Sequence, residues 1–277
     1  MIDLVDVIIL FLAGIAGGFL AGLLGIGGGV IYVLIFATYL RLLTDVPIPG
    51  DVLVKLTIAN SVFALIFAGI SGSYKQYKIG NFYPKLILFI GIPGVTSAVI
   101  ATYLLTLTNL YSKEEFAIVF SILLLPIIAR MLFKRKNGIS KVVIERYPPA
   151  LFSLIGFVSG AATAISGLGG GFIIVPILNG VLRFPIKKTI SISLGVIATV
   201  AMGLSLFNIF YFDYSYLEIP YMYGSISFIM VLPVIGGVLL GAPIGVLISQ
   251  RLPGFALRVF FVLFCVAVII KLFIDFI

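Results

Sequence analysis

The sequence contains no histidine, a single cysteine and few charged side chains. Without histidine, the chain lacks the residue that serves most proton shuttles, Ser–His dyads and zinc sites. Cys265 has no second cysteine in the chain to pair with, and it lies in an apolar run, where a thiol behaves as a small buried hydrophobe. No nucleophile–base pair or metal-ligand set is visible either, so we expect no enzyme, no catalytic or metal site and no cofactor.

Charged residues make up only 10% of the chain, whereas soluble domains have about a quarter. Apolar residues account for 62% and come in blocks of about 20, the length that crosses the hydrocarbon layer as a helix. The blocks are continuously apolar rather than alternating, so membrane strands are not expected. The composition predicts an all-α, polytopic helical membrane protein, in which the net charge of +8 reflects cytoplasmic loops rather than a nucleic-acid partner.

Two glycine-rich stretches indicate an internal repeat. GGFLAGLLGIGGGV at 17–30 has a counterpart in IGFVSGAATAISGLGGGF at 155–172, and both end in Gly-x-Gly-Gly-Gly. Later in each half, KLTIANS (55–61) and KTISIS (188–193) correspond more loosely. We therefore expect a first repeat at 1–138, a basic cytoplasmic linker at 139–147 and a second repeat at 148–277.

Each half contains five apolar segments. They are expected at 6–24, 30–43, 52–72, 83–107 and 114–133 in the first half, and at 149–167, 172–182, 188–211, 221–249 and 255–275 in the second. The second segment of each half is short for a membrane crossing, so whether it spans or only enters the bilayer is left open.

Basic residues predict the orientation in the cell membrane. The basic stretch KRKNGISKVVIERY at 134–147 is expected in the cytoplasm together with the loop that contains Lys75 and Lys78. Both termini are then expected outside, and Asp3 and Asp6 without a basic region argue against a cleaved signal peptide. Since the number of segments per half is odd, the halves face opposite ways as an inverted repeat, a common frame for secondary transporters.

The clusters GIGGG and GLGGG predict a break in two helices. Glycine permits the positive φ angles of a chain reversal, and a broken backbone in lipid must be satisfied by protein or by a water-filled cavity. The first turn of the helix after each break has unpaired N–H groups with partial positive charge, which suits an anion. The candidate site therefore includes Gly25, Gly27, Gly28, Gly29, Gly167, Gly169, Gly170 and Gly171.

Close helix packing through small residues is the alternative explanation for the glycines. It accounts for Gly14, Gly18, Gly22 and Gly25, which are spaced for one helix face. It accounts poorly for three consecutive glycines, because packing needs only one face.

Neutral hydrogen-bond donors at membrane depth are further candidates for the anion site. Thr57, Asn60 and Ser61 share one helix face by their spacing, and Ser166 lies beside the second glycine cluster. Ordinary hydrogen bonding between helices is the alternative for each of them. All ten acidic residues fall in loops or at segment ends, which disfavours a cation pathway or a carboxylate proton relay. The complete set of polar candidates is Thr57, Asn60, Ser61, Ser166, Thr189 and Ser193, with Ser191 and Asn179 as further donors and Lys55, Lys187 and Lys188 at the mouths of the third segments.

The chain resembles the sulfite exporter TauE/SafE permeases, also described as four-toluene sulfonate uptake permeases. The resemblance is carried by GFLAGLLGIGGGV, GFVSGAATAISGLGGGFIIVPIL, the duplicated halves and the later IPG and GAPIG stretches. Pro176 matches the family's proline five residues after the glycine triplet, whereas the first half has Leu34 there. The resemblance implies a secondary carrier in the plasma membrane, without an ATPase, for sulfur-containing anions such as sulfite or organosulfonates.

The sequence thus predicts a carrier in the lipid bilayer that alternates between outward and inward states about a central site for a small anion. A passive anion channel is the alternative, and a membrane enzyme or a non-transporting scaffold are further ones. A homodimer is left open.

Overall fold

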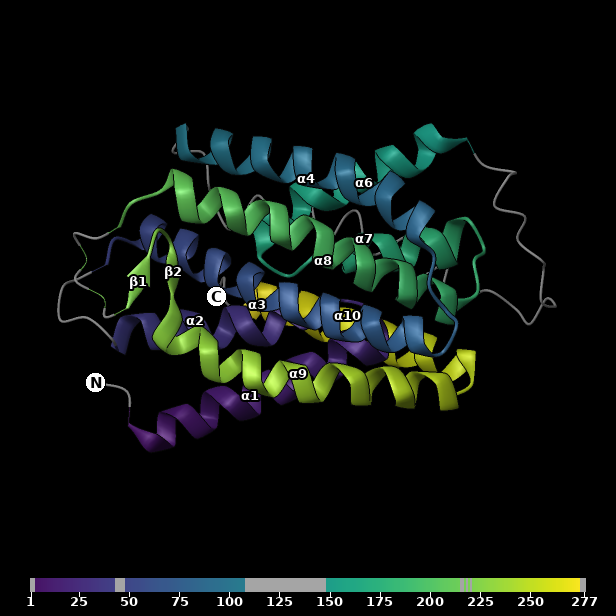
Figure 1. Cartoon of the computed structure of the whole chain (residues 1–277), viewed down its shortest axis with the longest axis horizontal. Helices are drawn as coiled ribbons and strands as arrows, with labels where there is room; N and C mark the ends of the chain where they lie inside the picture. The colour runs from purple at the N-terminus through teal and green to yellow at the C-terminus, as the bar shows by residue number, and fades with distance from the viewer. Residues whose placement is uncertain are drawn as a thin grey trace.

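The computed structural model describes residues 3–42, 48–107, 148–214, 217, 219 and 221–274 (Figure 1). The expected segment at 114–133 and the basic stretch at 134–147 lie outside these ranges. Six of the described helices are long and apolar enough to cross a membrane. The prediction of an all-α, polytopic membrane protein is therefore confirmed.

The described helices follow the expected apolar segments closely. In chain order the elements are α1 (Leu4–Leu24), α2 (Gly29–Leu42), α3 (Gly50–Lys78), α4 (Pro84–Leu107), α6 (Pro149–Ser166), α7 (Gly171–Val175), the π-helix η2 (Pro176–Val181), α8 (Ile186–Tyr211), the strands β1 (Met222–Tyr223) and β2 (Ile226–Ser227), α9 (Phe228–Arg251) and α10 (Gly254–Ile274). The six with sufficient length and hydropathy are α1, α3, α4, α6, α8 and α9.

The long helices pack as three pairs, each of which joins the two halves of the chain: α1 with α9, α4 with α6, and α3 with α8 (Figure 1). Helices α3 and α8 are the most buried of the six. They run antiparallel, because the Asn81 amide just after α3 donates a hydrogen bond to the carbonyl oxygen of Lys187 at the start of α8 (3.2 Å). Helices α1 and α6 also run in opposite directions along the bundle (Figure 1).

Glycines let the two outer pairs, α1 with α9 and α4 with α6, approach backbone to backbone. A Cβ at Gly18 of α1 would lie only 2.9 Å from the carbonyl oxygen of Val238 in α9, and one at Gly22 only 2.7 Å from the backbone nitrogen of Val246. The prediction of a glycine packing face is therefore confirmed for Gly14, Gly18 and Gly22. It is wrong for Gly25, because that residue leaves the helical path and lies against Ile190 of α8 instead.

Helices α6 and α4 pack in the same manner as α1 and α9. A Cβ at Gly156 would lie 2.8 Å from the carbonyl carbon of Ile90, and one at Gly160 would lie 2.6 Å from that of Gly94. Small residues thus join each half of the chain to the other half in both outer pairs.

The second expected segment of each half turns back rather than crossing. Helix α2 has 14 residues, a rise of about 21 Å, which is less than the roughly 30 Å of the hydrocarbon core. Near its end, the Tyr39 hydroxyl donates a hydrogen bond to Asp6 Oδ1 in the first turn of α1 (3.0 Å), so α2 returns to the end where α1 began. In the second half, α7 gives way to η2 at Pro176, because proline lacks the N–H that the α-helical bond needs.

A short β-hairpin of two-residue strands replaces the start of the helix expected at 221–249. Met222 pairs with Ser227 and Tyr223 with Ile226. Gly224 takes a left-handed conformation in the turn (φ +55°). The hairpin also contacts α3.

The two ends of the bundle differ in charge. We call the end that holds the start of α1 and the β1–β2 hairpin the hairpin end, and the opposite end the lysine end. The lysine end carries Lys75, Lys78, Lys85, Arg183, Lys187, Lys188, Arg251 and Arg258. Asp3, Asp6 and Asp51 lie at the hairpin end, together with two basic residues, Arg41 and Lys55.

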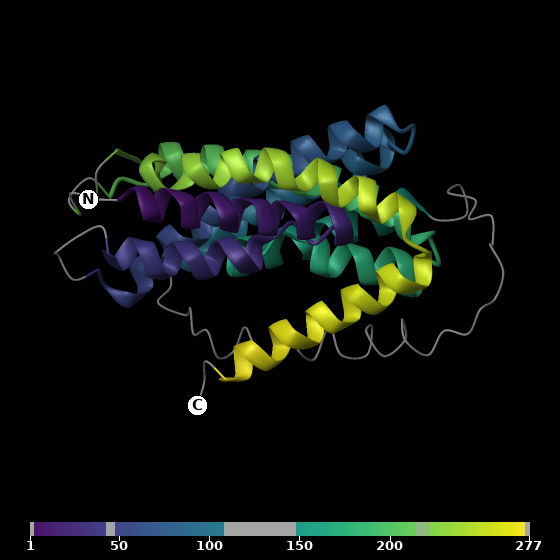
Figure 2. The same ribbon diagram turned by 90° about the horizontal axis from the view of Figure 1, so that it is seen from below.

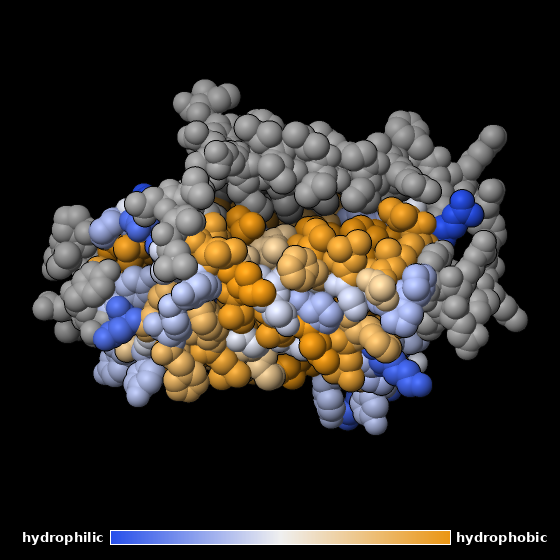
Figure 3. Space-filling view, turned by 90° about the horizontal axis from the view of Figure 1, so that it is seen from above, coloured by the Kyte–Doolittle hydropathy of each residue, from blue (hydrophilic) through white to orange (hydrophobic). Residues whose placement is uncertain are grey.

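A broad band of apolar side chains separates the two ends on the surface (Figure 3). Leu88 and Phe89 of α4 and Leu232 and Leu240 of α9 are about half exposed. Helix α10 lies obliquely against the bundle (Figure 2). Such a broad apolar surface fits contact with lipid.

Candidate functional site

Both glycine clusters lie where a helix ends and the next one begins. Helix α1 ends at Leu24, and Gly25 caps it in a left-handed conformation (φ +74°), its N–H donating to the carbonyl oxygen of Ala21 (2.8 Å). Helix α6 ends in the same way, with Gly167 at φ +66° and its N–H donating to the carbonyl oxygen of Thr163 (2.8 Å). The same reversal is therefore built twice, 142 residues apart in the sequence.

The two clusters pack directly against each other in the interior. A Cβ at Gly29 would lie 2.5 Å from the carbonyl oxygen of Gly167, and a Cβ at Gly171 would lie 2.8 Å from the Cα of Ile26. All residues of both clusters are buried. We call this contact between residues 25–29 and 167–171 the glycine crossing.

Two of the predicted site serines tie the crossing together. Ser61 Oγ in α3 donates a hydrogen bond to the carbonyl oxygen of Gly167 (2.7 Å), and Ser193 Oγ in α8 donates one to the carbonyl oxygen of Gly25 (2.6 Å). Each serine thus binds the glycine that caps a helix in the other half of the chain. Their hydroxyl hydrogens are used by the protein itself in this conformation.

Backbone donors remain at the crossing. Among the described residues, no hydrogen bond uses the amide N–H of Gly28, Gly29, Gly170 or Gly171. Gly29 and Gly171 are the first residues of α2 and α7, where helix geometry leaves N–H groups unpaired. The crossing is therefore a concentration of free N–H groups next to helix starts, an arrangement that attracts negative charge.

Of the other predicted site residues, Ser166 and Thr189 serve local contacts, whereas Thr57 does not. Ser166 Oγ donates to the carbonyl oxygen of Ala162 and accepts from the Leu168 N–H beside the crossing. Thr189 Oγ1 donates to the carbonyl oxygen of Pro185 within the start of α8. Thr57 Oγ1 is buried and has no hydrogen-bond partner among the described residues.

Asn60 holds the β-hairpin rather than the crossing. Its Oδ1 accepts a hydrogen bond from the Ser227 N–H (2.9 Å), and its Nδ2 donates to the carbonyl oxygens of Ser225 (3.1 Å) and Leu56 (2.8 Å). Asn60 is fully buried. The structure therefore brings together the glycines, Ser61 and Ser193, and places Asn60 and Thr189 elsewhere.

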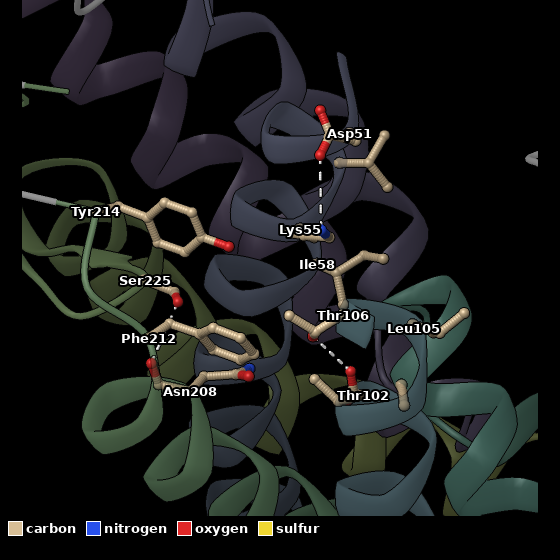
Figure 4. A pocket seen from close by; sticks show the side chains of 12 residues that line it. Asp51, Lys55, Ile58, Thr102, Leu105, Thr106, Asn208, Phe212, Tyr214 and Ser225 are labelled. Atoms are coloured by element: carbon tan, nitrogen blue, oxygen red, sulfur yellow. Dashed lines mark hydrogen bonds and ion pairs between the residues drawn. The ribbon is translucent and has the colours of Figure 1, made fainter. Parts of the chain in front are cut away.

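A pocket opens beside the crossing, at the hairpin end (Figure 4). Ile58 and Ala164 line it, and the Cα of Ile58 would lie 3.2 Å from a Cβ at Gly167. The wall of the pocket is therefore in contact with the second glycine cluster. Its polar lining is formed by Asp51, Lys55, Thr102, Thr106, Asn208, Tyr214 and Ser225.

The sequence had indicated Lys55 among these lining residues but missed the others. Lys55 Nζ lies 3.6 Å from Asp51 Oδ2 in an ion pair whose side chains are 31% and 62% exposed. Exposed pairs of this kind contribute little stability, so the lysine remains available to another anion. Within the described part of the chain, no group of three or more His, Cys, Asp or Glu side chains is placed to hold a metal ion.

Comparison with known proteins finds one matching family model and several similar membrane transporters. The family model described as "Sulfite exporter TauE/SafE" matches residues 10–272. A protein of Methanocaldococcus jannaschii described as a "Probable membrane transporter protein" is 28% identical over 88% of each chain. Proteins with the same description from Haemophilus influenzae (27% identical, 97% of this chain and 98% of the relative) and Bacillus subtilis (26%, 88% and 89%) are similar over nearly their whole length. No solved structure matches the chain.

Proposed function

The chain belongs to the sulfite exporter TauE/SafE family, and from this premise we propose that it is a secondary transporter for small sulfur-containing anions such as sulfite or organosulfonates. In this proposal it works as a permease by alternating access around a central anion site, without a catalytic step or a cofactor. The descriptions of the relatives support a membrane transporter.

The glycine crossing is the observation that carries the proposal. Two helix starts that belong to different halves meet there, and the N–H groups of Gly28, Gly29, Gly170 and Gly171 are free of protein acceptors among the described residues. Partial positive charge without a fixed cation binds an anion while allowing its release. Substrate sites of secondary transporters commonly lie at such discontinuous helices.

We interpret the two halves as inverted repeats. The opposite directions of α1 and α6, the matching caps at Gly25 and Gly167 and the reciprocal bonds from Ser193 and Ser61 support this interpretation. In an inverted repeat, the two halves can exchange conformations, which opens the central site first to one side of the membrane and then to the other.

In this proposal the lysine end faces the cytoplasm and the hairpin end faces the outside of the cell. The concentration of lysine and arginine at one end of the bundle supports this orientation, because cytoplasmic loops carry the excess of basic residues. Both termini are then outside the cell membrane.

The packing at the crossing supports a carrier over a passive channel. A Cβ at Gly29 would lie 2.5 Å from the opposing carbonyl oxygen, so the backbones of the two clusters touch. Ions cross a channel through a continuous pore, whereas a carrier keeps its site closed to at least one side.

Counterflow in proteoliposomes tests the proposed function. The purified protein is reconstituted with excess unlabelled sulfite inside, and radiolabelled sulfite is added outside. A carrier accumulates label transiently above its equilibrium level, and its initial rate saturates with concentration. Flux that rises linearly with concentration and shows no counterflow would instead establish a channel.

Thiosulfate, sulfate, sulfoacetate and taurine are tested in the same way to define the substrate. Protein-free liposomes and liposomes with heat-unfolded protein are the controls. Absence of saturable exchange for every one of these compounds would overturn the proposed substrate class.

A further inference from the structure

The pocket at the hairpin end contains a buried polar side chain that the protein does not use. Asn208 of α8 is only 3% exposed, and no hydrogen bond among the described residues involves its side-chain amide. Lys55 of α3 and Thr106 of α4 lie on other walls of the same pocket (Figure 4). A cation, an amide and a hydroxyl from three different helices therefore face one space. The cation is ion-paired with Asp51, and the Thr106 hydroxyl donates its hydrogen to the carbonyl oxygen of Thr102 (2.7 Å) and keeps its oxygen as an acceptor.

Each of these three residues has a counterpart at the lysine end when the two halves of the sequence are aligned. The offset of 132 positions that relates Ser61 to Ser193 also relates Lys55 to Lys187 and Gln76 to Asn208. For the outer helices the alignment comes from packing. Gly156 of α6 contacts Ile90 of α4, and Gly14 of α1 contacts Val234 of α9. Ile90 therefore corresponds to Val234, an offset of 144 positions between α4 and α9. The same offset relates Thr106 to Gln250.

At the lysine end, the three corresponding residues contact one another instead of lining a pocket. Lys187 Nζ donates a hydrogen bond to the carbonyl oxygen of Gln250 (2.5 Å). Gln250 Nε2 reaches Gln76 Oε1 (3.4 Å), and the same oxygen accepts a hydrogen bond from Asn81 Nδ2 (2.8 Å). The amide of Asn81 also bonds to the backbone of Lys187, which links α3, α8 and α9.

This closed arrangement leaves two buried polar groups unsatisfied. Gln76 Nε2 and, one turn away on α3, Ser73 Oγ are buried without a hydrogen-bond partner among the described residues. Because buried donors without acceptors are unfavourable, a state in which Gln76 meets water or an anion gains these interactions.

We infer that Lys55, Thr106 and Asn208 form an anion-binding vestibule at the hairpin end, and that Lys187, Gln250 and Gln76 form its counterpart at the lysine end. The hydrogen bond from Lys187 to Gln250 closes the second vestibule in this structure. The ligand class is a small oxyanion, which the lysine attracts and the amide orients. The inference rests on the proposed function, because it assigns the two access routes to the glycine crossing.

The two vestibules alternate. When Lys187 separates from Gln250, the lysine end opens and the Gln76 amide becomes free. At the same time the pocket beside Lys55 closes, in the way that the lysine end is closed in this structure. The pocket at the hairpin end contacts the crossing through Ile58, so an anion held there is one step from the central site.

Cysteine accessibility tests the closure. In a Cys265→Ala background, Ser73→Cys reports on the lysine end and Thr102→Cys on the pocket at the hairpin end. In the purified protein, a bulky polar maleimide is expected to label Thr102→Cys at least tenfold faster than Ser73→Cys. Adding Lys187→Met is expected to raise labelling of Ser73→Cys at least tenfold and to lower that of Thr102→Cys.

Lys85→Met is the matched control, because it removes the same charge at the same end from an exposed side chain. It should leave both labelling rates within twofold. Lys187→Arg retains a donor and should keep Ser73→Cys slow, which separates a latch from general damage to the fold. Unchanged labelling of both reporters in Lys187→Met would overturn the inference.

Anion binding at the hairpin end is tested by thermal stabilisation with sulfite and, in a separate series, sulfoacetate. Lys55→Gln and Asn208→Leu should each weaken the apparent affinity at least tenfold, whereas Lys85→Gln should not change it. Equal affinities in all variants would overturn the binding vestibule. If neither anion stabilises the wild type, the proposed substrate class fails, while the labelling experiment still decides whether the two ends alternate.

Discussion

The hydroxyl of Ser193 donates a hydrogen bond to the carbonyl oxygen of Gly25, 168 positions earlier in the chain and 2.6 Å away. Ser61 makes the equivalent bond in the opposite direction, to Gly167. The two bonds hold the ends of α1 and α6 against the helices at the centre of the bundle. Four consequences of this architecture can be measured.

Loss of either serine hydroxyl should destabilise the protein. Ser193→Ala leaves the buried carbonyl of Gly25 without its donor, and we expect a cost of about 1–3 kcal/mol in the free energy of unfolding. Denaturant unfolding in detergent measures it. Ser153→Ala, at a partly exposed position of α6, should stay within about 0.5 kcal/mol of the wild type. A fall in sulfite affinity at unchanged stability would instead make Ser193 a substrate ligand.

Two adjacent glycines of α9 should respond differently to the same substitution. Gly237→Ala places its methyl group 2.6 Å from the backbone nitrogen of Ile15, and we expect a loss of about 1–3 kcal/mol. Gly236→Ala meets only the ring of Phe11 at 3.3 Å and should be neutral or gain up to about 1 kcal/mol in helix propensity. Thermal unfolding of the two variants decides, and equal stabilities would contradict the close approach of α1 and α9.

Asn60→Ala should loosen the β-hairpin specifically. The substitution removes the acceptor of the Ser227 N–H and the donor to the Ser225 carbonyl. We expect backbone hydrogen exchange over 222–227 to accelerate by about tenfold or more, since each lost buried bond costs about 1–3 kcal/mol. Thr96→Ala, in an exposed part of α4, is the control. Unchanged exchange would show that other contacts hold the hairpin.

Labelling in intact cells tests the orientation. In a Cys265→Ala background, Tyr223→Cys in the hairpin should react with an impermeant maleimide added outside. Tyr77→Cys at the lysine end should react only after the membrane is permeabilised. Both tyrosines are well exposed, at 70% and 65%. The reverse pattern would place the lysine end outside the cell.

Most of the helical framework could be predicted because hydrophobic length is a local property of the sequence. The segment expected at 83–107 is α4 (Pro84–Leu107), and the one expected at 149–167 is α6 (Pro149–Ser166). The start of α9 was missed by seven residues. The pair Gly224-Ser225 is a local turn signal that was overlooked, whereas the bonds from Asn60 that hold the hairpin depend on long-range pairing.

The roles of the polar residues depended on long-range pairing and could not be predicted in the same way. Spacing places Ser61 on a polar helix face, but only the fold shows that its acceptor is the Gly167 carbonyl. Asn208 was missed because a single asparagine near a helix end has no local pattern. Its relation to Gln76 by the offset that aligns Ser61 with Ser193 was a signal available in the sequence.

The exchange of partners between the halves also constrains biosynthesis. Helix α1 finds its glycine-lined neighbour only in α9, the penultimate described helix, so its packing surface waits in the bilayer until almost the entire polypeptide has left the ribosome. Under the inverted-repeat interpretation proposed above, a protein made of one half would need two copies, inserted in opposite topologies, to assemble the same set of contacts.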